Sequence, residues 1–286
     1  MVSTAVMFAL LSLLFAGIND VVFKRYNHQD RSRGMLIGGI GVVWMSLQLF
    51  DMQLDHRSLA LNRAAWLYGS IAGICVATAN IALLEALRRI DVSLGSTIYR
   101  LNTIGVVILS VLFLNERLSI VKVSGIALGV LAVLLLYHHH ESKIEPRLVR
   151  LGLVIIIIGS ALRALFGVIS KAGLSEGVSP DALILLSAAC WIISGLSYAL
   201  IVERRLVVTP AKIAYALASG ALVYAIAKTL VTALTLGEAS IVVPIANMSF
   251  VVALLIAVAS KMERLTSRKI AAMVFAAGAV TVLTQA

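Results

Sequence analysis

Three cationic side chains lie deep inside long apolar stretches of this sequence: Arg100, Arg163 and Lys228. An ionisable group inside a bilayer is costly and typically lines a water-filled path. Arginine can bind a carboxylate or phosphate through two parallel hydrogen bonds, and lysine supplies a point charge. We therefore predict that these cations converge on an anionic small molecule. The alternative is that they pair with Glu85 and Asp20, or extend to the membrane interface, which is easiest for Arg100.

Two carboxylates, Asp20 and Glu85, also lie well inside apolar runs. Asp20 precedes Lys24 by four residues and Glu85 precedes Arg89 by four, so each can form an ion pair along one helix face. A carboxylate held away from such a partner could instead take up and release a proton and couple proton flow to transport. The sequence leaves both readings open, and simple pairing is favoured.

Neutral polar and aromatic side chains within the apolar runs could shape a binding cavity through hydrogen bonds. Their alternative role is packing between helices or anchoring at the interface. Trp44 and Trp191 could wall such a cavity or serve in packing between helices. The neutral candidates for substrate binding are Asn80, Tyr99, Asn102, Tyr224 and Asn247.

The composition of the chain requires a bilayer around it. Of its 286 residues 60% are hydrophobic and only 13% charged, with a mean hydropathy of +1.01, whereas soluble domains are about 45–50% apolar and about 25% charged. In lipid, only helices and closed barrels satisfy their own backbone groups. Segments such as 154–158 and 183–193 are apolar on every side rather than alternating, so we expect an all-α integral membrane protein.

A transmembrane helix needs about 20 mostly apolar residues, and ten such spans can be placed with short connections. The first apolar run has no basic segment before it and no cleavage site, so we expect a retained span rather than a signal peptide. Cys75 and Cys190 lie in apolar runs and are expected to be buried free thiols. The predicted location is the cell (inner) membrane, with several passes. The predicted spans are 3–23, 34–51, 64–87, 92–114, 119–137, 151–171, 181–202, 212–236, 238–260 and 268–285.

The two halves of the chain superimpose without a gap at an offset of 147 residues. Lys24 falls on Lys171, Trp44 on Trp191, and the segment 116–119 (Glu-Arg-Leu-Ser) on 263–266 (Glu-Arg-Leu-Thr). A constant offset across spans and loops indicates duplication. We predict a first five-helix repeat at 1–139, a connecting loop at 140–147 and a second repeat at 148–286. Because five is odd, the second copy must enter the membrane from the opposite side, which gives the inverted repeat of many secondary transporters.

The motifs that close each repeat carry a resemblance to a known family. Segments 113–119 (Phe-Leu-Asn-Glu-Arg-Leu-Ser) and 261–266 (Lys-Met-Glu-Arg-Leu-Thr) each precede a final helix rich in small residues. With them, the sequence resembles the ten-helix EamA type of the drug/metabolite transporter superfamily over essentially its whole length. Pro244 fits the family pattern, whereas its first-half counterpart, Thr97, departs from it. The resemblance implies the fold and transport, with export or exchange more typical than import, and does not fix the substrate.

Lysine and arginine are distributed unequally between the two predicted faces. One face collects 16 of these residues and the other 5, with the remaining 3 of the 24 inside spans. The positive-inside rule then places both termini outside and the 138–150 segment in the cytoplasm. Many relatives of the ten-helix type are drawn with both termini inside, so the charge distribution and the resemblance disagree.

Other motifs give little support for different functions. We expect Glu116-Arg117 and Glu263-Arg264 to form structural turns with ion pairs, and the adjacent histidines at 138–140 not to complete a metal site. No phosphate-binding loop or nucleophile–base arrangement is visible, so we predict no enzyme activity, cofactor or metal. The expected partners are the lipid bilayer and a small molecule, without nucleic acid, and homodimerisation is left open.

Two functions remain open at this point. The first is secondary active export or exchange of a small polar, anionic metabolite by alternating access. The second is proton-coupled export of amino acids or cationic drugs, with Asp20 or Glu85 as the coupling group.

Overall fold

The computed structural model describes residues 2–27, 32–90, 92–136, 145–204, 206, 208–261 and 265–286. Every regular element in these ranges is helical. The first half contains α1 (Val2–Asn27), α2 (Arg33–Leu54), α3 (Arg63–Ala86), α4 (Val92–Arg100), α5 (Asn102–Leu114) and α6 (Ile120–Leu135). The second half contains α7 (Pro146–Ser175), α8 (Pro180–Ile201), α9 (Pro210–Leu236), α10 (Ala239–Ala246), the 3₁₀ turn η1 (Asn247–Ser249), α11 (Phe250–Ala259) and α12 (Ser267–Leu283).

These helices form ten membrane spans, as predicted. Eight helical segments are long and apolar enough to cross a bilayer, and two of them, 94–114 and 239–259, are each built from successive helices. The 16-residue α6 and the 17-residue α12 complete the set. The α4–α5 pair is therefore the fourth span, and α10, η1 and α11 form the ninth.

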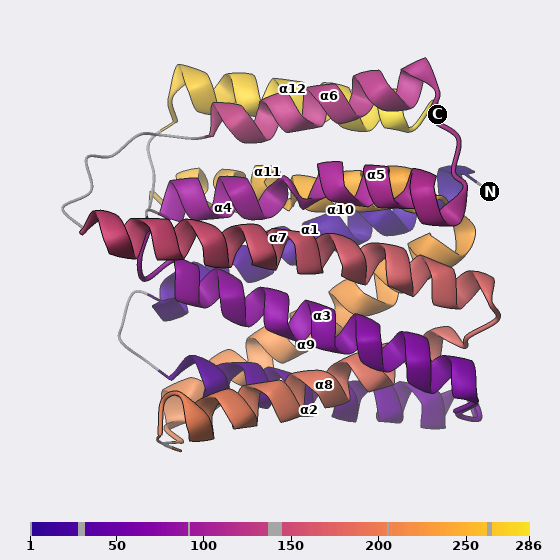
Figure 1. Cartoon of the computed structure of the whole chain (residues 1–286), viewed down its shortest axis with the longest axis vertical. Helices are drawn as coiled ribbons and strands as arrows, with labels where there is room; N and C mark the ends of the chain where they lie inside the picture. The colour runs from indigo at the N-terminus through magenta and orange to yellow at the C-terminus, as the bar shows by residue number, and fades with distance from the viewer. Residues whose placement is uncertain are drawn as a thin grey trace.

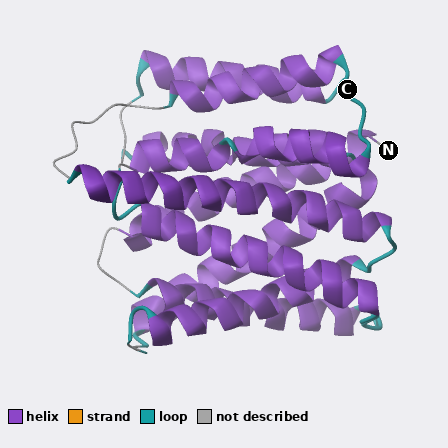
Figure 2. Ribbon diagram, viewed as in Figure 1, coloured by secondary structure: helices purple, strands orange, loops and turns teal. Residues whose placement is uncertain are grey.

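The spans run side by side, and the loops lie at the two ends of the bundle (Figure 2). Both chain termini lie at the same end, as an even number of spans requires (Figure 1). We call this the terminal end. The opposite end, where α6 ends and α7 begins, is the loop end.

Helix starts recur at the repeat offset, which shows that local capping was duplicated with the chain. The side chain of Asn62 accepts a hydrogen bond from the backbone of α3, and Thr209, 147 residues later, does the same for α9. Ser119 and Thr266 cap α6 and α12 in the same way. A side-chain oxygen at this position satisfies one of the unpaired N–H groups of the first turn.

The packing between helices obeys the same inverted symmetry. A methyl group added at Gly73 of α3 would lie 2.8 Å from the Sγ of Cys190, one of two free buried cysteines, on α8. At the equivalent Gly220 of α9, it would lie 2.5 Å from Cβ of Val43 on α2. Val43 and Cys190 are themselves 147 residues apart. Each copy therefore packs its third span against the second span of the other copy, with no room for a side chain at the contact.

The pseudo-two-fold axis passes between α2 and α8. Equivalent residues can touch each other only at such an axis, and the rings of Trp44 and Trp191 meet edge to face, with centroids 5.8 Å apart and an interplanar angle of 77°. Both rings are buried. The contact supports the packing role for this tryptophan pair.

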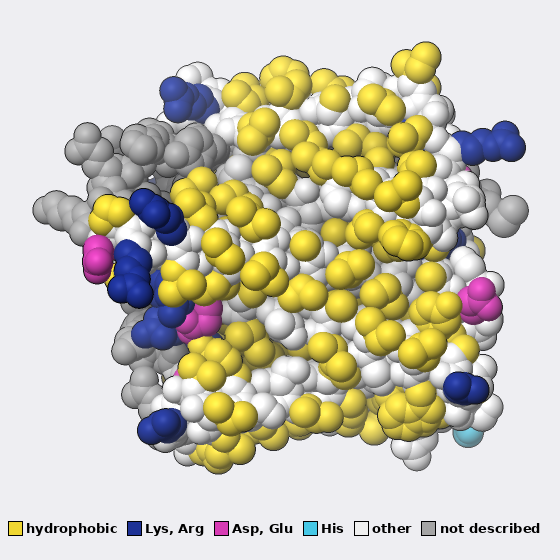
Figure 3. All heavy atoms as spheres, in the orientation of Figure 1, with side chains coloured by type: hydrophobic (Ala, Val, Ile, Leu, Met, Phe, Trp, Pro, Cys, Tyr) yellow, Lys and Arg dark blue, Asp and Glu magenta, His cyan; other side chains and the backbone are white. Residues whose placement is uncertain are grey.

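The outer surface of the bundle is a broad apolar band. Figure 3 shows hydrophobic side chains over the middle of the visible face, with Lys and Arg gathered mainly at the loop end. Many large apolar side chains on the helices are exposed, among them Val154 and Ile193, which is the arrangement expected of a protein surrounded by lipid.

Candidate substrate site

The breaks in the fourth and ninth spans meet inside the bundle. Arg100 ends α4 and donates a hydrogen bond to the carbonyl of Asn247, its own repeat equivalent, at 3.1 Å. The Asn247 amide donates to Asn102 Oδ1 at 2.7 Å and to Thr103 Oγ1 at 2.9 Å. Both spans break at equivalent positions although only the second contains a proline, Pro244. The polar groups that the breaks leave free satisfy one another across the pseudo-two-fold axis.

Arg100 is fully engaged at this junction. Its Nη2 lies 2.7 Å from Asp20 Oδ2 on α1, and its Nη1 donates to Ser249 Oγ at 2.9 Å. The guanidinium also lies over the Phe250 ring, 5.5 Å from its centroid. Asp20 thus neutralises Arg100, which is the pairing that the sequence left as the alternative. The Lys24 side chain, the other partner considered for Asp20, lies outside the described residues.

Arg163 lies near the middle of α7 on the face that points into the bundle. It follows the buried Gly159 by four residues and precedes the buried Phe166 by three, so the three share one side of the helix. The exposed residues of this stretch, including Ile157 and Ile158, lie on the opposite side. The contact of the Arg163 guanidinium is with the Phe166 ring, 5.4 Å from its centroid.

No carboxylate among the described residues pairs with Arg163, which separates it from Arg100 and Lys228. Tyr99, at the break in the fourth span, is close enough to interact electrostatically with Arg163, Asp20 and Arg100. Its hydroxyl oxygen is buried and has no hydrogen-bond partner within the described ranges. The break in the fourth span is therefore accompanied by the Arg163 cation and by the Tyr99 hydroxyl, which lacks a hydrogen-bond partner within the described ranges.

Lys228 belongs to a separate network near the terminal end. Its ammonium group contacts the Asp51 carboxylate and lies 3.4 Å from the Tyr224 hydroxyl. Asp51 also binds Arg57, which in turn binds Asp181 at the start of α8. Burial disfavours the charged form of Arg57, but the two carboxylates outweigh it and raise the pKa of its guanidinium. Lys228 is therefore already paired, but with Asp51 and not with Glu85 or Asp20, the partners considered for it.

Asp51, Arg57 and Asp181 were not predicted as site residues, because all three lie at span ends, where charged residues are ordinary. Their repeat equivalents, Tyr198, Arg204 and Gly34, do not share their charge pattern. Asp51 and Asp181 lie near span ends, and neither has a charged residue at the equivalent position of the other repeat. A search on these two criteria would have found both.

Glu85 lies at the loop end, away from this network. Arg89 binds it at 2.6 Å, Arg88 lies at 3.5 Å, and the Tyr198 hydroxyl donates a hydrogen bond to it. The predicted helix-face pair of Glu85 and Arg89 is confirmed. Asn80 donates to the carbonyl of Val76, one turn earlier in α3, at 2.8 Å.

The repeat motif clamps the start of the ninth span. The Glu116 carboxylate accepts hydrogen bonds from the backbone N–H groups of Ala239 and Ser240, at 2.8 and 2.9 Å. A negative charge is stabilised at a helix N-terminus, so Glu116 caps α10. Lys122 contacts Glu238 and donates to the carbonyl of Arg117 at 2.8 Å. The structural role expected for this motif holds, but its partner is the other repeat. Glu263, Arg264 and the histidines at 138–140 lie outside the described residues.

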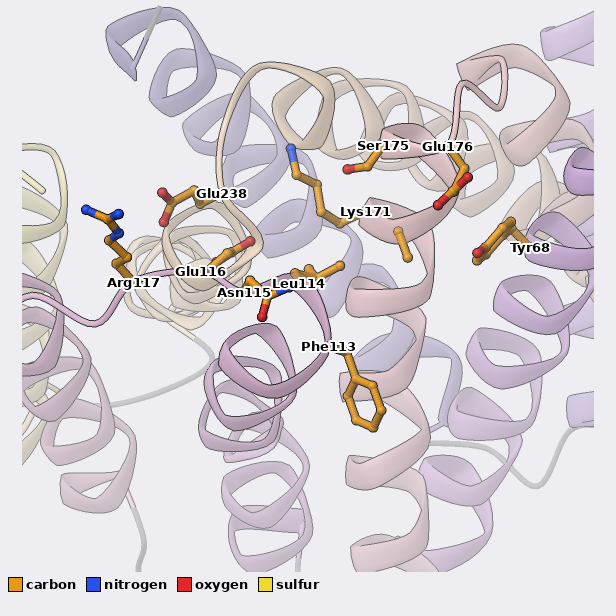
Figure 4. A pocket seen from close by; sticks show the side chains of 11 residues that line it. Tyr68, Phe113, Leu114, Asn115, Glu116, Arg117, Lys171, Ser175, Glu176 and Glu238 are labelled. Atoms are coloured by element: carbon orange, nitrogen blue, oxygen red, sulfur yellow. The ribbon is translucent and has the colours of Figure 1, made fainter.

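A pocket of about 610 Å³ lies beside this clamp at the terminal end. Figure 4 shows Glu116 and Glu238 on one side of it and Tyr68 and Glu176 on the other, with Lys171 between them. The Lys171 ammonium donates to the carbonyl of Leu234 at the end of α9, at 2.7 Å. The pocket is therefore lined by charges of both signs that also hold helix ends together.

The fold and the polar junction define a multi-pass membrane transporter built from inverted repeats. The family model for EamA-like transporters matches residues 3–138. Over these residues, which are just under half of the chain, the sequence is similar to this family of drug/metabolite transporters. The protein functions as a transporter and not as an enzyme.

Comparison with solved structures supports the fold over the whole chain. A structure described only as "Crystal structure of protein" superimposes with a TM-score of 0.84 at 15% identity, covering 98% of this chain and 96% of the other. At that identity the likeness concerns the fold alone. No curated protein matches the sequence.

Proposed function

We propose that this protein is a secondary transporter that exports or exchanges a small, polar, anionic metabolite by alternating access, and that Arg163 holds the anionic group. The observation that carries this proposal is the position of Arg163 at mid-span, facing the bundle interior, without a carboxylate partner among the described residues.

The energetic argument rests on the cost of an unpaired charge. An arginine at the centre of a bilayer costs at least about 2.5–3.5 kcal/mol on insertion scales. Arg100 and Lys228 meet this cost with Asp20 and Asp51. For Arg163, a bound carboxylate or phosphate would supply the missing charge, and the buried Tyr99 hydroxyl, which has no partner in the described ranges, would donate to the same ligand. Asn102 and Asn247 line the neighbouring break, where the ligand's other polar groups would bind.

The inverted repeat supports alternating access. The two copies have equivalent packing, so they can exchange conformations and open a central site to each side in turn. The predicted repeat boundaries, 1–139 and 148–286, belong to this proposal.

A thermal-shift screen of the detergent-purified protein tests the proposal. Phosphorylated, carboxylated, zwitterionic and cationic metabolites are added to the wild type, Arg163→Ala and Arg163→Lys, with the exposed Arg117→Ala as a matched control. We expect one anionic class to raise the melting temperature of the wild type and of Arg117→Ala. The shift should vanish in Arg163→Ala and be reduced in Arg163→Lys, because lysine cannot form two parallel hydrogen bonds.

Stabilisation only by cations or zwitterions, unchanged in Arg163→Ala, would overturn the anionic substrate. It would favour the proton-coupled alternative with Asp20 as the coupling group, since Glu85 is held by Arg89, Arg88 and Tyr198. Transport that collapses with the proton gradient and is lost in Asp20→Asn would then identify that mechanism.

A further inference from the structure

Two interactions join the repeats near opposite ends of the bundle. At the terminal end, Asp51 in the last turn of α2 binds Lys228 of α9. At the loop end, Tyr198 in the last turn of α8 donates a hydrogen bond to Glu85 of α3. We call these pairs the terminal latch and the loop latch.

The two latches occupy pseudo-equivalent places. Asp51 and Tyr198 are 147 residues apart, and the equivalent of Glu85 is Thr232, one helical turn from Lys228. Each latch therefore ties the end of the second span of one copy to the third span of the other. The chemistry differs: one latch is an ion pair and the other a hydrogen bond from a phenol to a carboxylate.

We infer that the terminal latch and the loop latch are the positioning interactions that decide which end of the transporter opens. This inference rests on the alternating access proposed above. The pseudo-two-fold axis exchanges the ends of the bundle, so a conformation open at one end converts, under the symmetry, into a conformation open at the other. If a contact between helices breaks when one end opens, its repeat equivalent must break when the other end opens. The α2–α9 and α3–α8 contacts are such a pair, and both latches are closed in this structure.

Both latches can open without leaving a carboxylate unpaired. When Lys228 moves away, Asp51 keeps Arg57. When Tyr198 moves away, Glu85 keeps Arg89. An uncompensated carboxylate would make opening costly, so the retained arginine lets each contact break and re-form.

Labelling of a buried reporter cysteine from each side of the membrane tests this inference. The background is Cys75→Ala/Cys190→Ala, and the reporter is Ser170→Cys, at a fully buried position on α7 whose hydroxyl has no partner in the described part of the chain. A membrane-impermeant maleimide is applied to right-side-out and inside-out vesicles. Ser58→Cys, in the exposed loop after α2, identifies the side that holds the terminal end.

We expect Lys228→Met and Asp51→Asn to raise labelling from the terminal side by about fivefold, the factor for a partly exposed ion pair. Tyr198→Phe should raise labelling from the loop side by about tenfold, since a hydrogen bond to a charged group is stronger. The matched control is Asp55→Asn, which removes another carboxylate bound to Arg57 but joins no two spans. It should leave labelling unchanged.

Equal effects on both sides, or none in variants that keep the wild-type melting temperature, would overturn the latches. An effect of Asp55→Asn as large as that of Asp51→Asn would also overturn them. Because labelling uses no substrate, its outcome is independent of the anion screen, and the two proposals can fail separately.

Discussion

The two ends of the α2–α8 pair use the same repeat positions in opposite ways. At the loop end, Gly34 and Gly195 bring the helix backbones together: a methyl group added at Gly34 would lie 2.7 Å from the carbonyl oxygen of Gly195. Their equivalents at the terminal end are Asp181 and Gln48, whose side chains form a hydrogen bond at 2.8 Å. The same repeat positions therefore make a backbone contact at one end and a side-chain hydrogen bond at the other.

This difference indicates how an inverted repeat can work asymmetrically. Close backbone contact is rigid, because no side chain can rearrange within it. The terminal end instead depends on Asp181, Arg57 and Asp51, whose charged side chains are partly exposed, and on the buried amide of Gln48. Such interactions weaken in water and salt. We therefore expect the terminal end to respond to charge and the loop end to respond to volume.

The largest expected effect comes from adding volume at the loop end. Gly195→Leu places a side chain against the backbone of α2, where even a methyl group has no room. We expect a loss of at least about 3 kcal/mol of stability, at the upper end for overpacking, seen as loss of folded protein in size-exclusion chromatography. Gln48→Leu, at the equivalent position, should keep most of the wild-type melting temperature, because Asp181 retains Arg57. Equal damage from both changes would remove the contrast between the ends.

A smaller loss is expected from breaking the terminal network at its centre. Arg57→Gln leaves Asp181, whose side chain is only 13% exposed, with Gln48 as its remaining partner. We expect a destabilisation of about 1–2 kcal/mol, reduced from the fully buried case because Arg57 itself is partly exposed. The melting temperature measures it, with Arg63→Gln in the following helix start as the control. A wild-type melting temperature would show that the network contributes nothing.

Double-mutant cycles can rank the two latches. Asp51→Asn with Lys228→Met should give a coupling energy of about 0.5–1 kcal/mol, the range of partly exposed ion pairs. Tyr198→Phe with Glu85→Gln should give about 1.5 kcal/mol, because the acceptor is charged and less exposed. Thermal unfolding of the four proteins in each cycle provides the values. A larger coupling at the terminal latch would reverse the proposed order of strength.

The smallest effect should be that of salt. Raising the sodium chloride concentration from 0.05 to about 0.5 M shortens the Debye length and weakens exposed ion pairs. Labelling of the Ser170→Cys reporter from the terminal side should rise by about twofold, and labelling from the loop side should change less. In Lys228→Met the terminal response should disappear, since the ion pair is already absent. A persistent response would place the salt-sensitive element elsewhere.

Much of the fold could be predicted from the sequence because it depends on local properties. Apolar length determines where spans form, and the capping residues Asn62, Ser119, Thr209 and Thr266 determine where helices begin. The constant offset of 147 residues made the duplication visible, and an odd number of spans per copy made the repeat inverted. None of these predictions depends on which helices are neighbours in the folded protein.

The candidate site could be predicted only in part. The sequence identified the buried cations and carboxylates by their apolar surroundings, but assigned their partners by spacing along one helix. That assignment was confirmed for Glu85 and Arg89. Pairing of a buried cation with Asp20 was left as an alternative, but the sequence could not single out Arg100, 80 residues away, as that cation. The capping of α10 by Glu116 was not predicted.

The ten spans and the two inverted copies could be predicted from the sequence alone, because hydropathy and the repeat offset act locally or by chain order. The three-dimensional arrangement was needed to show that Arg100 and Lys228 are paired and that Arg163 has no carboxylate partner among the described residues. A charge inside a membrane is stabilised by an opposite charge that lies close to it in space. Which charges lie close together depends on how the helices cross, and the local sequence pattern does not encode this.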